Sequence, residues 1–164
     1  MEKTNKNCKN KKTKISFVIP CYRSENTHEG VIDEIRQTLS EMPDYDYEIV
    51  LVNDCSPDNT FEVIQKLCDK YDNITGIDFA RNFGQHAALM AGLRASCGDI
   101  VVCMDDDGQT PANEVGKLIA EIENGRDVVY ASYENKMHST FRNFGSRLND
   151  LMTRVMLGKP KDLH

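Results

Sequence analysis

Three consecutive aspartates follow an apolar run, and their spacing could hold a metal ion. Residues 101–104 are apolar, and Asp105, Asp106 and Asp107 come directly after them. Because successive side chains of a strand point to opposite faces, Asp105 and Asp107 should project together while Asp106 turns aside. Paired carboxylates repel each other unless a cation lies between them, and Mg²⁺ or Mn²⁺ prefers such oxygen ligands. We therefore expect a divalent metal site here; the simpler alternative is a solvated acidic turn.

The composition is typical of a soluble domain with one core. The chain has 164 residues, of which 40% are hydrophobic and 28% are charged. No apolar run approaches the length of a membrane span, and no apolar signal segment follows the polar start. We therefore expect one domain and a cytoplasmic location.

The cysteines and histidines do not predict a metal site of their own. The 6 cysteines include no pair separated by two residues, and several lie inside apolar segments, so we interpret them as reduced, buried thiols. None of the 4 histidines pairs with a cysteine at zinc-ligand spacing, so we expect no zinc.

The net charge of −6 is unevenly distributed, because lysines crowd residues 1–14. We interpret this segment as a basic tail that is disordered; the alternative is that it contacts an anionic membrane surface or a nucleic acid. The rest of the chain is acidic and shows no basic face, which argues against nucleic acid as a partner.

Short apolar runs alternate with amphipathic stretches, as in parallel strands joined by crossover helices. We expect strands at residues 15–20, 47–54, 74–80, 100–104 and 127–132. Helices are expected at 29–39, after 56–58, at 85–95, after 110–111 and around 141–155. This order predicts an α/β fold with an open, mostly parallel, doubly wound sheet and helices on both faces.

Polar residues follow most of the predicted strands. Ligands of such sheets bind at the carboxyl ends of the strands, beside the reversal of strand order. The residues expected at this edge include Glu25, Asp54, Arg81, Asn82, Asp105, Asp107 and Gln109. Because converging carboxylates must be offset by a cation or a ligand, we interpret the acidic triplet as functional.

Four segments carry a family resemblance: VIPCY at 18–22, LVNDCSPD at 51–58, ARNFGQ at 80–85 and MDDDGQTP at 104–111. In this order and spacing they resemble the family-2 glycosyltransferases of the GT-A fold. The chain is most similar to the branch that transfers a sugar from a nucleotide to a polyprenyl phosphate. Dolichyl-phosphate mannosyltransferases and bacterial undecaprenyl-phosphate sugar transferases belong to that branch, which acts in the synthesis of cell-envelope polysaccharides.

The resemblance implies a role for each matching position. Asp105, Asp107 and Gln109 would gather Mg²⁺ or Mn²⁺ against the donor diphosphate, and the two aspartates are the catalytic candidates. The implied donor-binding residues are Pro20, Tyr22, Glu25, Asp54, Arg81, Asn82 and Arg142. For Arg81 the alternative is a surface ion pair. Tyr133 occupies a position where relatives usually have an arginine, and Lys136 is a substitute that lacks the guanidinium fork.

The implied reaction is attack by an acceptor oxygen on the anomeric carbon of a nucleoside-diphosphate sugar, with inversion and transfer of a hexose-type sugar. A polyprenyl phosphate acceptor is already ionised and needs no strong base, in agreement with the lack of a convincing catalytic histidine. A sugar-hydroxyl acceptor would need a carboxylate base beyond His164. Peripheral contact with the inner face of the membrane would suit a lipid acceptor.

Two other functions remain open. Nucleotidyl transfer would need a glycine-rich loop after the first strand, where the chain has no glycine before Gly30. A donor-binding module without turnover is the second alternative, because relatives continue beyond His164 with acceptor-site residues. We therefore expect residues 15–164 to form a nucleotide-sugar-binding domain that is truncated in its acceptor part.

Overall fold

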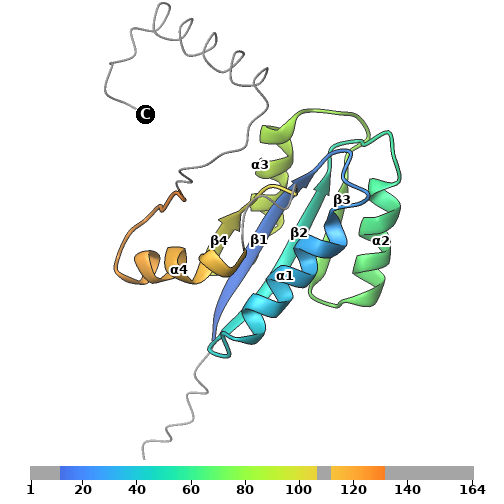
Figure 1. Cartoon of the computed structure of the whole chain (residues 1–164). Helices are drawn as coiled ribbons and strands as arrows, with labels where there is room; N and C mark the ends of the chain where they lie inside the picture. The colour runs from blue at the N-terminus through green and yellow to red at the C-terminus, as the bar shows by residue number, and fades with distance from the viewer. Residues whose placement is uncertain (1–11, 107–111, 132–164) are drawn as a thin grey trace, which may run out of the picture. The chain divides into compact units, whose positions relative to one another are not determined.

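The computed structural model of the chain describes residues 12–106 and 112–131. The chain divides into two compact units, residues 1–129 and 130–164, and the regular elements of the described residues belong to the first. In chain order these elements, shown in Figure 1, are β1 (Thr13–Cys21), α1 (His28–Ser40), β2 (Tyr45–Asn53), α2 (Thr60–Lys70), β3 (Ile74–Asp78), α3 (Gln85–Ala95), β4 (Ile100–Cys103), the 3₁₀ turn η1 (Ala112–Glu114) and α4 (Val115–Glu123).

The four strands form one parallel sheet in the order β3-β2-β1-β4. The chain steps outward from β1 to β2 and β3, and α3 then carries it back to place β4 on the other side of β1. The strand order therefore reverses between β1 and β4, and their carboxyl ends are the point where such sheets bind ligands. The sheet confirms the predicted α/β fold, and α3 has its predicted bounds.

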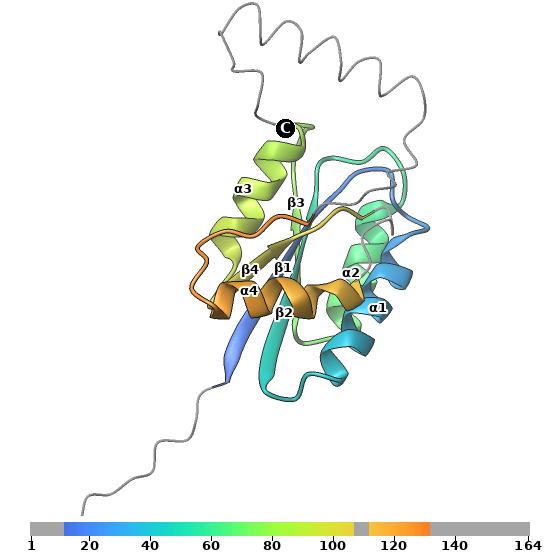
Figure 2. The same ribbon diagram turned by 60° about the vertical axis from the view of Figure 1, so that its left-hand side comes forward.

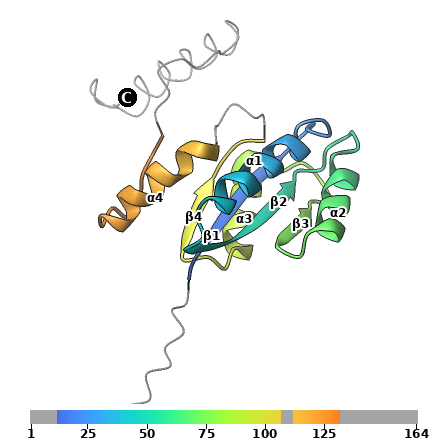
Figure 3. The same ribbon diagram turned by 60° about the horizontal axis from the view of Figure 1, so that its bottom comes forward.

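Each face of the sheet carries its own layer of buried side chains. Phe17 and Ile19 of β1 pack with Ile35 of α1 in the larger cluster. On the other face, Val18 of β1 packs with Ala88 of α3. Figures 2 and 3 show α1 and α3 on opposite sides of the sheet. Because both faces are covered, β1 is a nearly continuous apolar run rather than an alternating one.

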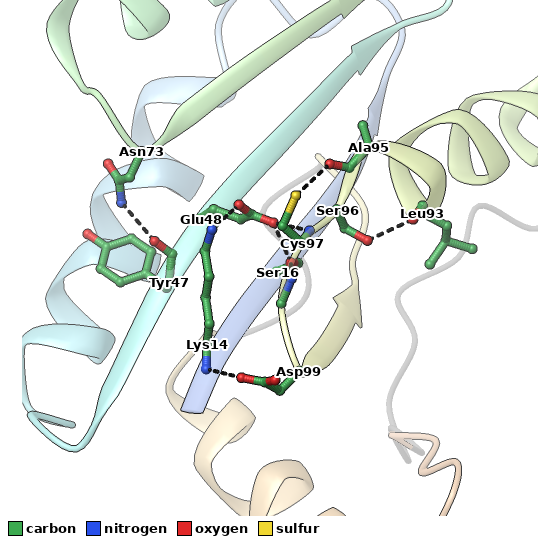
Figure 4. A network of polar contacts seen from close by, with 11 residues as sticks. Lys14, Ser16, Tyr47, Glu48, Asn73, Leu93, Ala95, Ser96, Cys97 and Asp99 are labelled. Atoms are coloured by element: carbon green, nitrogen blue, oxygen red, sulfur yellow. Dashed lines mark hydrogen bonds and ion pairs between the residues drawn. The ribbon is translucent and has the colours of Figure 1, made fainter. Parts of the chain in front are cut away.

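Polar contacts at the amino-terminal edge of the sheet fix β4 beside β1 (Figure 4). The Oε1 of Glu48 accepts hydrogen bonds of 2.6 Å from the Ser16 hydroxyl and 2.6 Å from the Cys97 N–H. The Ser16 Oγ in turn accepts a hydrogen bond of 2.8 Å from the Gly98 N–H, and Lys14 forms an ion pair with Glu48. The turn between α3 and β4 is therefore tied to both central strands.

The strand predicted at residues 127–132 is wrong for the part that the structure describes. Residues 128–131 have no regular structure, and the side chains of Val128 and Tyr130 are 65% and 88% exposed. The apolar run favoured a strand, but within the described residues no neighbouring strand pairs with it. Ser132 and the helix predicted around 141–155 lie outside the described residues.

The helix predicted after Thr110 and Pro111 is confirmed as α4, with Val115 and Ile119 buried as expected. The longest described helix, α1, has 13 residues. None of the described helices combines the length and the hydrophobicity needed to cross a bilayer.

Candidate functional site

The pairing of β1 with β4 stops before β1 ends, and Pro20 lies at this point. The register ends with Val18 opposite Cys103, whereas β1 continues to Cys21. The Val18 carbonyl still accepts a hydrogen bond from Met104 N–H, at 3.2 Å. Because backbone groups alternate along a strand, the nitrogen of Pro20 also faces β4, and it has no N–H to continue the ladder. The two strands therefore part here, and residues 104–106 leave the sheet beside the end of β1.

The loops after β1 and β2 contain two strained residues. Arg23 and Cys55 have φ angles of 58° and 52°, in the left-handed region that non-glycine residues rarely adopt. A hydrogen bond of 3.1 Å from the Arg23 N–H to the Ser56 Oγ joins the two loops. Such strain is concentrated at functional sites, where the surrounding structure holds it in place. The backbone strain at Arg23 and Cys55 therefore supports the carboxyl-terminal edge of the sheet as the candidate site.

The carboxylates of Asp105 and Asp106 have partners on different sides of the sheet. Gln85, the first residue of α3, donates from Nε2 to Asp105 Oδ1 at 2.9 Å. The backbone N–H of Tyr22 donates to Asp106 Oδ2 at 3.3 Å, and Asp106 also lies near His28, at the start of α1. Asp105 therefore points toward the α3 side and Asp106 toward the α1 side.

Asp105 has the chemistry that a hard divalent ion requires. Its carboxylate is exposed at the switch point, and its Oδ1 is oriented by the hydrogen bond from Gln85. Carboxylate oxygens are the ligands that Mg²⁺ and Mn²⁺ prefer. The other two predicted ligands, Asp107 and Gln109, lie outside the described residues, so their roles stay predictions.

Asp54 holds the segment between β3 and α3. Its carboxylate accepts hydrogen bonds of 2.7 Å from the Phe83 N–H and 2.8 Å from the Gly84 N–H. Its backbone carbonyl accepts a third, of 3.1 Å, from the Asn82 side-chain amide. Gly84 has a φ of +90°, which a residue with a side chain would adopt only with strain. Asp54 is 4% exposed, so its contacts in this structure are to the chain itself rather than to an open pocket.

The remaining donor-binding candidates are distributed along the same edge. Tyr22 is 46% exposed beside Asp106. The Arg81 guanidinium lies over the Phe83 ring, 4.6 Å from its centroid, and in the described residues it makes no ion pair. Glu25 accepts a hydrogen bond of 3.0 Å from the N–H of Asn59, the residue before α2. The structure thus brings Tyr22 together with Asp106, the residue after Asp105, and Asn82 together with Asp54, while Glu25 contacts the residue before α2. Arg142, Tyr133 and Lys136 lie outside the described residues.

Sequence reasoning missed a group of three side chains at the end of β1. One potential ligand atom each of Cys21, His28 and Asp106 lies within 4.8 Å of the other two. Burial raises the pKa of the Cys21 thiol well above its ordinary value, and the nearby charge of Asp106 raises it further. Burial also lowers the pKa of His28, although the charges of Asp106 and Asp58 oppose this. No spacing could have indicated the group, because its members come from three segments that only the sheet order brings together.

Comparison with known sequences gives a family match over most of the chain. The profile of glycosyl transferase family 2 matches residues 16–163. An undecaprenyl-phosphate 4-deoxy-4-formamido-L-arabinose transferase of Proteus mirabilis is 33% identical over 147 residues, which are 89% of this chain and 45% of that protein. A transferase of the same name from Yersinia pestis is 35% identical, with coverage of 89% and 45%. The chain spans less than half the length of these relatives.

Solved structures with the same architecture confirm the predicted GT-A type of fold. The mannosyltransferase PcManGT of Pyrobaculum calidifontis, solved with GDP-Man and Mn²⁺, gives a TM-score of 0.54 at 23% identity, over 64% of this chain and 30% of that one. Mannosyl-3-phosphoglycerate synthase of Rubrobacter xylanophilus gives 0.54 at 21% identity, over 67% and 36%. At 23% and 21% identity, the similarity to these two structures is evidence for a shared fold only.

Proposed function

Because the chain belongs to glycosyl transferase family 2, we propose that it forms the donor-binding part of a sugar transferase. The enzyme would move a hexose-type sugar from a nucleoside-diphosphate sugar to polyprenyl phosphate, with inversion at the anomeric carbon. The observation that carries the proposal is the parting of β1 and β4 at the switch point, where the exposed Asp105 and its neighbour Asp106, which is hydrogen-bonded to the Tyr22 N–H, leave the sheet. The names of the relatives from Proteus mirabilis and Yersinia pestis support undecaprenyl phosphate as the kind of acceptor.

The donor would lie across the carboxyl ends of the strands. The exposed ring of Tyr22 can border the nucleoside, and Glu25 of the same loop, which contacts the residue before α2, would lie at the edge of that pocket. The Arg81 guanidinium is free of carboxylate partners within residues 12–106 and 112–131, so it can contact the donor phosphates or sugar. Asp54 and Asn82 serve the donor by holding the segment that carries Arg81, and Arg142 would add a phosphate contact.

Asp105, Asp107 and Gln109 would hold Mg²⁺ or Mn²⁺ beside the donor diphosphate. When bound, such an ion supplies positive charge that stabilises the nucleoside-diphosphate leaving group. The presence of Mn²⁺ with GDP-Man in the PcManGT structure supports this cofactor. The chain itself orients the proposed metal ligand Asp105. Gln85 holds one oxygen of its carboxylate by a hydrogen bond, and Asp54 holds the loop that leads into Gln85.

A lipid phosphate acceptor fits the described residues, because a phosphate oxygen is ionised near neutral pH and needs no general base. A sugar hydroxyl of a cell-surface polysaccharide would need a carboxylate base. For a lipid acceptor the enzyme would work at the inner face of the membrane. The lysines of residues 1–14 would favour contact with anionic lipids there.

Calorimetric titration with UDP-sugars and GDP-mannose, with and without Mn²⁺, tests the donor site. We expect binding that requires Mn²⁺ and is lost in Asp105→Asn and in Asp107→Asn. Asp69→Asn, an exposed substitution on α2, is the matched control and should bind as the unmodified chain does. Metal-independent binding, or no binding of any nucleotide, would overturn the proposal.

Turnover separates the remaining candidate functions. Sugar transfer to a short polyprenyl phosphate would support the transferase, and transfer only to a sugar hydroxyl would replace the lipid acceptor. Because the chain spans 42–45% of the length of its relatives, donor binding without turnover is the second candidate. Synthesis of a nucleotide sugar from a sugar 1-phosphate and a nucleoside triphosphate would instead identify a pyrophosphorylase.

A further inference from the structure

Cys21, His28 and Asp106 form a compact group of three different metal-ligating side chains at the end of β1. A Cys21 Sγ, a His28 ring nitrogen and an Asp106 carboxylate oxygen lie within 4.8 Å of one another. We propose that these three residues bind Zn²⁺, in a site separate from the Mg²⁺ or Mn²⁺ site of Asp105. This proposal does not rest on the proposed sugar-transfer function.

The ligand set matches zinc rather than a hard ion. Zn²⁺ accepts thiolate, imidazole and carboxylate ligands together, whereas Mg²⁺ takes oxygen ligands almost exclusively. Bond lengths of about 2.0–2.3 Å in a tetrahedral site place the ligand atoms about 3.3–3.8 Å apart. The observed upper limit of 4.8 Å is therefore within reach of small side-chain rotations. Water would occupy the fourth position.

The charges of the group also balance in the presence of zinc. A thiolate, a carboxylate and a neutral imidazole together carry two negative charges, which one Zn²⁺ neutralises. This matters because the Cys21 and His28 side chains are only 1% and 2% exposed, and a buried charge without a partner is strongly unfavourable. Asp106 is half-buried and offers the ion an approach from solvent.

Neighbouring groups can orient the ligands. The Tyr22 N–H donates to Asp106 Oδ2 at 3.3 Å, which leaves the other carboxylate oxygen available. The Ser24 hydroxyl lies 3.4 Å from His28 Nε2. If His28 coordinates through Nδ1, Nε2 carries the proton and donates to Ser24, the arrangement usual around zinc-bound histidines.

A cysteine, a histidine and an aspartate could also form a nucleophilic triad, but the burial of this group argues against that role. The Cys21 thiol donates to the Ile19 carbonyl at 3.2 Å, and at 1% exposure it offers no surface to a substrate. A metal ion needs far less space than a substrate carbonyl. Bound zinc would join β1, α1 and the segment after β4 at the switch point, and would thereby anchor the residue next to Asp105.

Cobalt substitution tests the proposed thiolate ligand. Co²⁺ bound through a thiolate gives a sulfur-to-metal charge-transfer absorption, and zinc should displace it. We expect this band in the unmodified chain and in Cys97→Ser, an exposed control, and its loss in Cys21→Ser. Absence of the band from the unmodified chain, or its persistence in Cys21→Ser, would overturn the proposal.

Residues of the same types outside the group supply matched controls for the other two ligands. In competition with a chromophoric chelator, Asp106→Asn and His28→Gln should weaken zinc binding by at least about tenfold, the loss expected even for an outer partner of a zinc ligand. Asp105→Asn and His86→Gln should bind zinc as the unmodified chain does. Equal losses in Asp105→Asn and Asp106→Asn would show that the site is not separate.

Thermal unfolding of the unmodified chain gives a test that does not depend on the folding of any variant. Zinc that binds the folded chain should raise the melting temperature in proportion to the logarithm of its concentration, also when excess Mg²⁺ is already present to occupy the site of Asp105. An unchanged melting temperature at rising zinc concentrations would contradict the proposal.

Discussion

Asp54 Oδ2 accepts a hydrogen bond of 2.8 Å from the backbone N–H of Gly84, so that the residue directly after β2 holds the residue directly before α3. The next residue, Gln85, donates to Asp105 after β4. The carboxyl ends of β2 and β4 are not neighbours in the sheet, because β1 lies between them. They are nevertheless connected through Gly84 and Gln85, which couples the position of Asp105 to a buried carboxylate at the end of another strand.

Asp54→Asn should destabilise the fold. The asparagine oxygen can accept from one of the two N–H groups, but its NH₂ would then face the other as a second donor. Hydrogen bonds to charged groups contribute about 1.5–3 kcal/mol each, so we expect a loss of roughly this size in the free energy of unfolding. Urea unfolding measures it as a lower midpoint at unchanged slope. Asp69→Asn is the control, and equal midpoints for the two variants would contradict the role of Asp54.

Gly92→Ala should be destabilising although it lies in a helix. A Cβ on Gly92 would lie 2.3 Å from Val18 Cγ1 and 3.3 Å from Val52 Cγ2, in the layer between α3 and the sheet. Overpacking of this kind costs about 1–3 kcal/mol, which exceeds the gain of about 1 kcal/mol in helix propensity. Thermal or urea unfolding would measure the difference.

Gly116→Ala is the matched control for Gly92→Ala. Gly116 lies in α4, and a Cβ there would meet no atom within 4 Å. This substitution should therefore be neutral or stabilising by up to about 1 kcal/mol. Val18→Ala in the Gly92→Ala background should recover part of the lost stability, because it removes the methyl group that the new Cβ meets. Similar effects of the two alanine substitutions would show that α3 does not pack as closely as described.

The sheet could be predicted because β1, β2 and β4 each contain a short apolar run bounded by polar residues, a local pattern. The bounds of α3 were also readable, since Gly84 precedes a stretch of good helix formers. The predicted strand at 127–132 had the same local pattern, but a strand also needs a partner, and none pairs with residues 128–131 in the described structure. The hydrophobic pattern of a segment indicates which secondary structure it favours. Whether a strand forms also depends on whether the fold places another strand beside it.

The sequence could predict which edge of the sheet carries the candidate site, but not which residues contact one another there. The sequence pattern placed Asp105 and Asp54 at this edge, because both come at the end of predicted strands. The two backbone donors that occupy Asp54, and the meeting of Cys21 with Asp106, depend on which strand lies next to which. Contacts between segments that are distant in sequence cannot be predicted from the residue spacing within either segment.

Stability should fall in acid partly through Glu48. Burial would raise the pKa of Glu48, but hydrogen bonds from Lys14, Ser16 and the Cys97 N–H together lower it below its ordinary value of 4.5. Since the folded-state pKa is the lower one, Glu48 stabilises the fold above pH 4.5 and loses this contribution as the pH falls through the folded-state pKa. Urea unfolding across this range should show a smaller decline in Glu48→Gln than in the unmodified chain. Glu62→Gln, exposed on α2, should follow the unmodified chain, and parallel curves for all three would exclude the contribution.

Gln85 should tune metal-dependent donor binding without being a metal ligand. Its Nε2 donates to Asp105 Oδ1 at 2.9 Å, so Gln85→Ala leaves the carboxylate in place but free to rotate. Loss of one orienting hydrogen bond should weaken Mn²⁺-dependent binding of the sugar nucleotide by about two- to tenfold. Calorimetric titration measures this change, and removal of the metal with a chelator should abolish binding in both the variant and the unmodified chain. His86→Ala alters the exposed neighbour on the same helix turn and should have no effect. An effect of His86→Ala as large as that of Gln85→Ala would mean that the start of α3, rather than the bond to Asp105, controls the site.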